Sequence, residues 1–289
     1  MERKVKRVFE GRQTMEGAGV RLKRVFGYNE VPLLDPFLLL DHFGSKNPAD
    51  YVMGFPWHPH RGIETVTYMW DGEVEHGDSM GNSGVIRSGD VQWMTAGSGI
   101  IHQEMPGRYD GLMRGFQLWV NLPAEKKMMT PRYRGITRDQ IPTLEKEGAK
   151  IRVVAGRIDE VEGPVRDLVV RIGYFDVLLA AGKAFVHSTD RDDRVFAYAV
   201  EGSAYSQSTQ IKPFHCGVFG EGDSVKIETK DGVRFLLVTG EPLKEPVAWG
   251  GPIVMNSEEG LAKAFRELEE GTFIKAGKTV DASRGFYRG

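Results

Sequence analysis

The sequence contains almost no cysteine and no long hydrophobic run. Cys216 is the single cysteine among 289 residues, so an intrachain disulfide is excluded and we expect this residue to be packed inside a protein of a reducing compartment. The first segment, MERKVKRVFEGRQTMEG, is charged throughout and lacks the apolar core of a signal peptide. The apolar stretch 33–40 is interrupted by Asp35 and Pro36, so it falls short of the roughly 18 apolar residues of a membrane span. We therefore predict a soluble protein of the cytoplasm, or of the nucleus in a eukaryotic cell.

The sequence also lacks an excess of charge of one sign. Lys and Arg total 38 against 40 Asp and Glu, which gives a net charge of −2, so no overall attraction to nucleic acid or to an anionic membrane is expected. Two short basic clusters, from Arg3 to Arg7 and from Arg21 to Arg24, alternate with apolar residues. Such alternation is typical of the solvated face of a strand. We expect neither nucleic acid nor membrane among the direct partners.

Helical patterns are scarce, and short apolar stretches bounded by glycine fill most of the chain. Segments such as TVTYMWDGEVEHGDS and FAYAVEGSAYSQS combine β-branched and aromatic residues with Asp-Gly or Glu-Gly pairs. This spacing is typical of an all-β sandwich or barrel.

One segment, 258–270, has a helical pattern instead. Asn256 or Ser257 would cap its N-terminus and Gly271 would end it. Its apolar residues recur at i, i+3, i+4 and i+7, and they are Leu261, Ala264, Phe265 and Leu268. We predict an all-β protein with a short C-terminal α-helix.

The chain divides into two halves that resemble each other. Residues 136–148 lie in a charged, proline-punctuated stretch, which predicts a linker between a domain at 1–135 and a domain at 149–289 that ends in the helix. Three residues of YMWDG have counterparts in YAVEG at a constant offset of 130 positions, namely Tyr68 and Tyr198, Asp71 and Glu201, and Gly72 and Gly202. The offset predicts two copies of one β fold.

Histidine and glutamate pairs on two predicted strands form the strongest functional signal. Side chains at i and i+2 of a strand point to the same face, so His58 projects with His60, and His102 with Glu104. Two adjacent strands would then supply four ligands to one metal. Imidazole and carboxylate groups suit iron, manganese, nickel, copper or zinc, and the absence of a thiolate argues against a closed structural zinc site. An octahedral ion held by four groups keeps two positions for water, substrate or dioxygen.

Glu64 is an alternative to Glu104 as the fourth ligand. It shares the strand parity of His58 and His60, and parity alone does not decide between the two carboxylates. The other histidines are isolated or adjoin turn residues, and we assign them structural roles: His42, His76, His187 and His215.

Seven segments resemble the motifs of the cupins, and specifically those of the pirin family. In order along the chain they are DPFLLLDHFG, GFPWHPHRGIETVTY, GDVQWMTAGSGIIHQEMP, GFQLWVNLP, GEGDSV, GEPLKEPV and GPIVMNSEE. The resemblance covers nearly the whole chain and implies a bicupin, with two β-barrel or jelly-roll domains packed face to face and metal only in the N-terminal one. By position, the family's ligands fall on His58, His60, His102 and Glu104. Glu64 would then orient a ligand without binding the metal.

The second copy of the fold lacks the ligands. The 130-residue offset places Ser188, Asp190 and Arg194 where the first copy has two histidines and Glu64. We therefore expect no metal in the C-terminal domain, and we expect the two mutually covering barrels to form a monomer.

The resemblance also implies an activity, because some pirins resemble quercetin 2,3-dioxygenases, which open the heterocyclic ring of a flavonol with dioxygen. It implies one divalent metal, Fe(II) in first place with Ni, Cu, Mn, Co or Zn as alternatives, and a small aromatic chelating substrate. Glu104 would remove the proton of the substrate hydroxyl beside the metal. Aromatic and thioether residues expected to line the pocket are Trp93, Met94, Met105, Phe116 and Trp119.

Two other functions remain open for this fold. Eukaryotic pirins are nuclear iron proteins, so the alternative is a non-enzymatic, redox-sensing regulator that binds transcription-related protein partners. The chain shows no cluster typical of a nuclear localisation signal, and we therefore place this reading second. Cupins also include sugar isomerases and decarboxylases with similar ligands, and the metal would discriminate among them.

Overall fold

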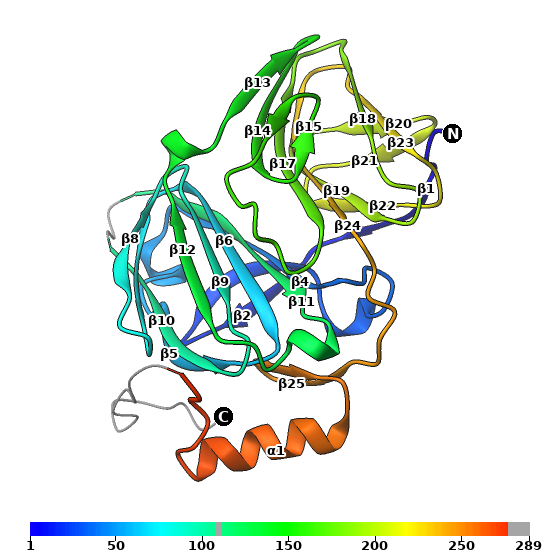
Figure 1. Cartoon of the computed structure of the whole chain (residues 1–289). Helices are drawn as coiled ribbons and strands as arrows, with labels where there is room; N and C mark the ends of the chain where they lie inside the picture. Colours follow the sequence, from blue (N-terminus) through cyan, green and yellow to red (C-terminus); the bar gives the residue numbers. More distant parts are fainter. Residues whose placement is uncertain (108–110, 277–289) are drawn as a thin grey trace. The chain divides into compact units, whose positions relative to one another are not determined.

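The computed structural model describes residues 1–107 and 111–276 and confirms an all-β chain with a C-terminal α-helix (Figure 1). The chain forms two compact units. The N-terminal unit comprises residues 13–29, 37–138 and the segment from Lys244 onward, and the C-terminal unit comprises residues 1–12, 30–36 and 139–243. Across the described residues, no helix is long and apolar enough to cross a membrane.

The N-terminal unit contains a seven-stranded sheet in the order β12-β9-β6-β11-β4-β3-β2 and a four-stranded sheet in the order β5-β10-β7-β8. The larger sheet consists of β2 (Arg12–Glu16), β3 (Val20–Phe26), β4 (Phe37–Ser45), β6 (Ile63–Asp71), β9 (Val91–Thr95), β11 (Met113–Asn121) and β12 (Arg132–Ile136). The smaller sheet consists of β5 (Phe55–His60), β7 (Glu73–Asp78), β8 (Ser83–Arg87) and β10 (Ile100–Pro106). The hairpin of β25 (Ala248–Gly250) and β26 (Ile253–Met255) and the helix α1 (Glu258–Glu269) complete the unit.

The C-terminal unit has a seven-stranded sheet in the order β1-β22-β19-β24-β17-β14-β13 and a four-stranded sheet in the order β18-β23-β20-β21. The larger sheet consists of β1 (Val5–Glu10), β13 (Thr143–Lys146), β14 (Ala149–Ala155), β17 (Ile172–Leu179), β19 (Arg194–Gly202), β22 (His215–Phe219) and β24 (Val233–Gly240). The smaller sheet consists of β18 (Ala184–Ser188), β20 (Ala204–Ser206), β21 (Thr209–Ile211) and β23 (Ser224–Glu228). A small hairpin joins β15 (Arg157–Ile158) to β16 (Val161–Glu162). The short 3-10 turns are Tyr28–Glu30, Pro48–Asp50, Ala124–Lys126 and Arg138–Gln140.

The two units repeat one topology. Their sheets have the same strand counts, and β5 and β6 of one unit occupy the places of β18 and β19 in the other. The edge position held by β12 in the N-terminal unit is held by β1 in the C-terminal unit, where Glu10 pairs with His215. The start of the chain therefore completes the sheet of the second copy.

The ends of the chain belong to different units from those predicted at 1–135 and 149–289. The first twelve residues lie in the C-terminal unit, and the segment carrying α1 lies in the N-terminal unit. Apolar burial explains the second placement, because one cluster joins Ile101 of β10 to Ala248 and Ile253 of the hairpin, to Leu261 and Ala264 of the helix and to Phe273 after the helix. The boundary at residue 138 nevertheless lies inside the predicted linker 136–148.

The helix confirms the predicted pattern with two refinements. Ser257 is the N-cap, and its hydroxyl accepts a hydrogen bond from the Gly260 amide at 3.1 Å. Leu261 and Ala264 are buried, whereas Phe265 is 39% exposed. The buried stripe is therefore narrower than the predicted one.

Candidate metal centre

The four-stranded sheet of the N-terminal unit brings the predicted ligands together. His58 of β5 lies directly opposite His102 of β10, and His60 lies opposite Ile100. On the other side of β10, β7 pairs His102 with Asp78 and Glu104 with His76. Alternation along each strand therefore directs these side chains to one face of the sheet.

The three histidines form a compact cluster. Their ligand atoms lie within 4.8 Å of one another. The ring centroids of His58 and His102 are 4.3 Å apart, and that of His60 lies 4.8 Å from the first and 5.0 Å from the second. His60 and His102 are buried, and His58 is half-buried. One ion between the rings would contact all three imidazoles.

Backbone carbonyls orient two of the rings. The Nδ1 atom of His58 lies 2.8 Å from the carbonyl oxygen of Pro56, and the Nδ1 atom of His60 lies 3.2 Å from that of Pro252. A carbonyl oxygen only accepts, so each Nδ1 carries the proton and each Nε2 keeps its lone pair. Neither ring nitrogen of the fully buried His102 has a hydrogen-bond partner among the described residues.

The electrostatics of the cluster favour metal binding. Burial lowers the pKa of all three imidazoles, and the neighbouring histidines lower the pKa of His60 and His102 further. The rings are therefore neutral at physiological pH, as a metal ligand must be. Buried nitrogen atoms without partners are costly, and a divalent transition metal would supply the missing partner. The residues present fit such an ion.

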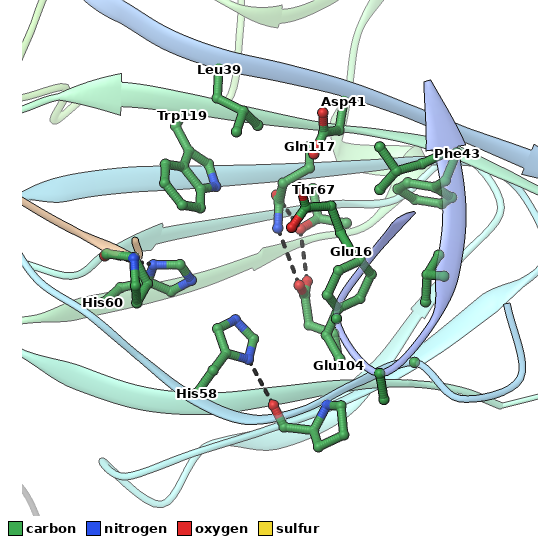
Figure 2. A pocket seen from close by; sticks show the side chains of 18 of the residues that line it. Glu16, Leu39, Asp41, Phe43, His58, His60, Thr67, Glu104, Gln117 and Trp119 are labelled. Atoms are coloured by element: carbon green, nitrogen blue, oxygen red, sulfur yellow. Dashed lines mark hydrogen bonds between the residues drawn. The ribbon is translucent and has the colours of Figure 1, made fainter. Parts of the chain in front are cut away.

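Glu104 is held beside the cluster by two neighbours. Its carboxylate accepts hydrogen bonds from the Thr67 hydroxyl at 2.8 Å and from the Gln117 amide at 3.1 Å, and Figure 2 shows it turned toward both. The group of ligand atoms within 4.8 Å of one another, searched among the described residues, contains the histidines alone. Glu104 as fourth ligand therefore stays a prediction.

Glu64 lies away from the histidines. A turn separates β5 from β6, so the parity of His58 and His60 does not continue into β6. Within β6, Thr67 faces the cluster, and Glu64, three positions earlier, points to the opposite face of the sheet. There its carboxylate accepts a hydrogen bond from Thr95 at 2.6 Å, and burial raises its pKa. This position gives no support to a role in orienting a ligand.

Comparisons with known proteins identify the family. The model described as Pirin matches residues 19–120, and the model of the Pirin C-terminal cupin domain matches residues 174–274. A pirin-like protein of Caulobacter vibrioides is 43% identical over 273 residues, which cover 94% of this chain and 99% of that protein. The chain belongs to the pirin family.

Other pirins and a solved structure agree with this assignment. Human pirin is 40% identical over 270 residues, which cover 90% of this chain and 91% of that protein. The crystal structure of a quercetin 2,3-dioxygenase from Acinetobacter baumannii is 31% identical, with a TM-score of 0.89 over 94% of this chain and 99% of that chain. The match to the Acinetobacter baumannii structure confirms the predicted architecture of two cupin domains.

In this pirin the cluster opens into a cavity of about 560 Å³, whose wall includes His58, His60 and Glu104. Of the predicted lining residues, Trp119 lies in the wall, with its ring 5.1 Å from that of His60. The others lie outside the wall, and they are Trp93, Met94, Met105 and Phe116. Met105 and Phe116 are immediate neighbours of wall residues in their strands, so they point to the opposite face.

Two groups near the pirin site were not predicted to belong to it. His76, predicted to be structural, is buried with its ring 5.5 Å from that of His102 and stacked at 4.7 Å on Tyr133. The sequence did carry a signal for His76, because His76 and Asp78 are two positions apart in β7 and such side chains point to the same face of a strand. In the structure the two side chains approach within 3.4 Å. Trp249 and Pro252 also line the cavity. No sequence pattern around Trp249 and Pro252 indicated that this late part of the chain would reach the site.

Proposed function

We propose that this protein is a metal-dependent dioxygenase that opens the heterocyclic ring of flavonols such as quercetin with O2. The observation that supports it best is the cluster of three neutral imidazoles with an oriented carboxylate beside it, because His58, His60 and Glu104 of this group line a cavity. The name of the Acinetobacter baumannii relative, quercetin 2,3-dioxygenase, supports this reaction.

The ligand set of the proposed centre is His58, His60, His102 and Glu104. Fe(II) is the proposed ion, and Ni, Cu, Mn, Co or Zn would suit the same donors. These residues would hold an ion whose Lewis acidity would lower the pKa of a bound hydroxyl group and favour the reaction of substrate with dioxygen.

Glu104 is the proposed base. Its carboxylate takes the proton of the flavonol 3-hydroxyl, and the hydrogen bonds from Thr67 and Gln117 hold it in place for that transfer. Each carboxylate oxygen accepts more than one hydrogen bond, so these two bonds leave room for the substrate. The substrate then carries the negative charge needed for reaction with O2.

The cavity suits a flat organic molecule. Its volume of about 560 Å³ lies within the range of roughly 300–1,000 Å³ typical of small-molecule sites. Trp119 and Phe43 add aromatic surface to the wall, and Figure 2 shows both beside the polar groups of the cavity. This combination would bind an aromatic ring system while its oxygen atoms point to the histidines.

Oxygen uptake with quercetin tests the proposal. The metal-loaded protein should consume O2 and release carbon monoxide, and Glu104→Gln should lower turnover by roughly 10²- to 10⁴-fold, the usual contribution of a general base. Glu75→Gln is the matched control, because Glu75 is exposed in the neighbouring strand β7 and should leave turnover unchanged. Full metallation without uptake would reject the dioxygenase and favour the iron-binding regulator.

A further inference from the structure

The hairpin β25–β26 lies against the chain that carries His60. Arg61 pairs with Ile253, and the Val254 amide donates to the Arg61 carbonyl at 3.0 Å. The approach is so close that a Cβ atom on Gly62 would lie 1.9 Å from the Val254 carbonyl oxygen. Only glycine fits there, so the backbone of β26 packs directly against the turn that follows β5.

Buried cations fix this arrangement. The Lys127 ammonium donates to the Gly62 carbonyl at 2.9 Å and to the Val254 carbonyl at 3.0 Å. The guanidinium of Arg61, which is 2% exposed, donates to the Phe273 carbonyl at 2.8 Å and lies 2.8 Å from the Glu267 carboxylate. Buried charge-assisted bonds of this kind hold both segments in one geometry.

The turn of this hairpin contacts a metal ligand directly. The Pro252 carbonyl accepts the proton of His60 Nδ1 at 3.2 Å. A carbonyl in this position sets the tautomer and the plane of the imidazole ring. The orientation of His60 therefore depends on the conformation of residues 250–252.

Strand β25, just before this turn, supplies an aromatic side chain to the wall of the cavity. The indole of Trp249 donates to the Gly251 carbonyl at 2.7 Å, which ties its ring to the turn. Its ring lies 5.9 Å from that of Trp119 and 5.6 Å from that of Tyr28, and Trp119 in turn lies 5.1 Å from His60. The three aromatic rings thus form a row from His60 to Tyr28, which is 69% exposed.

We propose that the segment from Trp249 to Pro252 has two roles: Trp249 contacts the planar ring of the substrate, and Pro252 positions His60. The inference deepens the proposed function and rests on it for the flavonol. Trp249 is then a specificity-determining residue, and its hydrogen bond to Gly251 links substrate contact to the geometry of the metal ligand.

Two substitutions separate the two roles. Trp249→Phe removes the indole N–H but keeps an aromatic ring, whereas Trp249→Ala removes both. Phe214→Ala is the matched control, because Phe214 is a partly exposed aromatic residue of the C-terminal unit. Thermal unfolding of each variant, compared with that of the parent protein, verifies that it is folded.

The first measurement is the affinity of the full chain for Ni²⁺, determined by competition with a chelator. Both Trp249 variants should bind Ni²⁺ roughly tenfold more weakly than the parent. A tenfold loss is at the lower end of the loss of metal affinity seen when groups that orient metal ligands are mutated. The control should stay within about twofold of the parent. A Trp249→Phe protein with the Ni²⁺ affinity of the parent would overturn the positioning role.

The second measurement is calorimetric binding of quercetin to the Ni²⁺-loaded protein in the absence of O2. Trp249→Ala should weaken binding by roughly 2- to 10-fold, the worth of one aromatic contact, and Trp249→Phe should retain most of the affinity. Unchanged binding in Trp249→Ala would overturn the substrate contact. A parent that binds Ni²⁺ but not quercetin would reject both the flavonol and this contact, while the nickel experiment still decides the positioning role. A parent that binds no Ni²⁺ would reject the metal centre and the positioning role together.

Discussion

His58 and His102 face each other across the neighbouring strands β5 and β10, and their ring centroids lie 4.3 Å apart. This pairing makes the cluster dependent on the register of two strands, because a shift of one residue would turn one ring to the opposite face. The proposed metal centre therefore depends on the geometry of the sheet, and we expect the sheet to stay folded when one ring is removed.

The first prediction concerns the histidines. His102→Ala removes a fully buried proposed ligand, so the purified protein should retain less than roughly one tenth of the parent's metal, because even the loss of a residue that only orients a ligand costs roughly 10- to 100-fold in metal affinity. Elemental analysis measures the metal. His215→Ala, in the C-terminal unit, is the control and should keep the parent's metal content. Full metallation of both His58→Ala and His102→Ala would contradict the ligand assignment.

The second prediction concerns the orientation of Glu104. Thr67→Val removes the hydroxyl that donates to the carboxylate at 2.8 Å while it nearly conserves side-chain shape. We expect kcat/KM for quercetin in the fully metallated protein to fall roughly 10-fold, because a base that is poorly positioned transfers protons inefficiently.

Thr65→Val provides the matched control for that prediction. Thr65 lies two residues earlier in β6, is fully buried, and its hydroxyl has no hydrogen-bond partner within the described parts of the chain. Loss of this hydroxyl should leave kcat/KM nearly unchanged. An equal loss in both variants would mean that altered packing, rather than the contact with Glu104, reduces turnover.

Strand periodicity was sufficient to predict much of the fold and the core of the site. His58, His60 and His102 occupy alternating positions in β5 and β10, and alternation is a local property that the sequence reports directly. The constant offset between the halves likewise predicted the repeated topology, since equal strands occupy equal places in both units.

Other features depend on contacts between distant parts of the chain. Parity placed Glu64 with the histidines because it ignored the turn between β5 and β6, which restarts the alternation. The contact between Pro252 and His60 joins residues 192 positions apart, and no periodic pattern records it. The same is true of β1, which completes a sheet formed by residues beyond position 140.

The third prediction is a dependence of stability on pH. His42 is 7% exposed, and burial together with the positive charges of Arg114 and Lys23 lowers its pKa to about 3. The unfolded chain, with a pKa of about 6.5 for this residue, binds the proton more readily. Stability should therefore fall as pH decreases from about 6.5 toward about 3.

Urea unfolding at pH 7 and pH 5 measures this effect. Between these values the parent should lose about 2 kcal/mol more than His42→Gln, because about 1.5 pH units of that window lie below 6.5. Both proteins are compared with the same metal loading. Equal losses in the parent and the variant would show that His42 is protonated in the folded state.

The fourth prediction tests whether the packing of α1 stabilises the N-terminal unit. Ala264 is fully buried against the cluster that includes Ile101 of β10, so Ala264→Asp would bury an unpaired carboxylate at a cost of about 3 kcal/mol. The thermal midpoint of the unit should fall by roughly 6–12 °C. Lys263→Asp, at the exposed neighbouring position, is the control and should change the midpoint little. If Ala264→Asp unfolds at the parent's temperature, the helix contributes nothing to the stability of the unit, and the arrangement of the turn around Pro252 would depend on Lys127 and Arg61 alone.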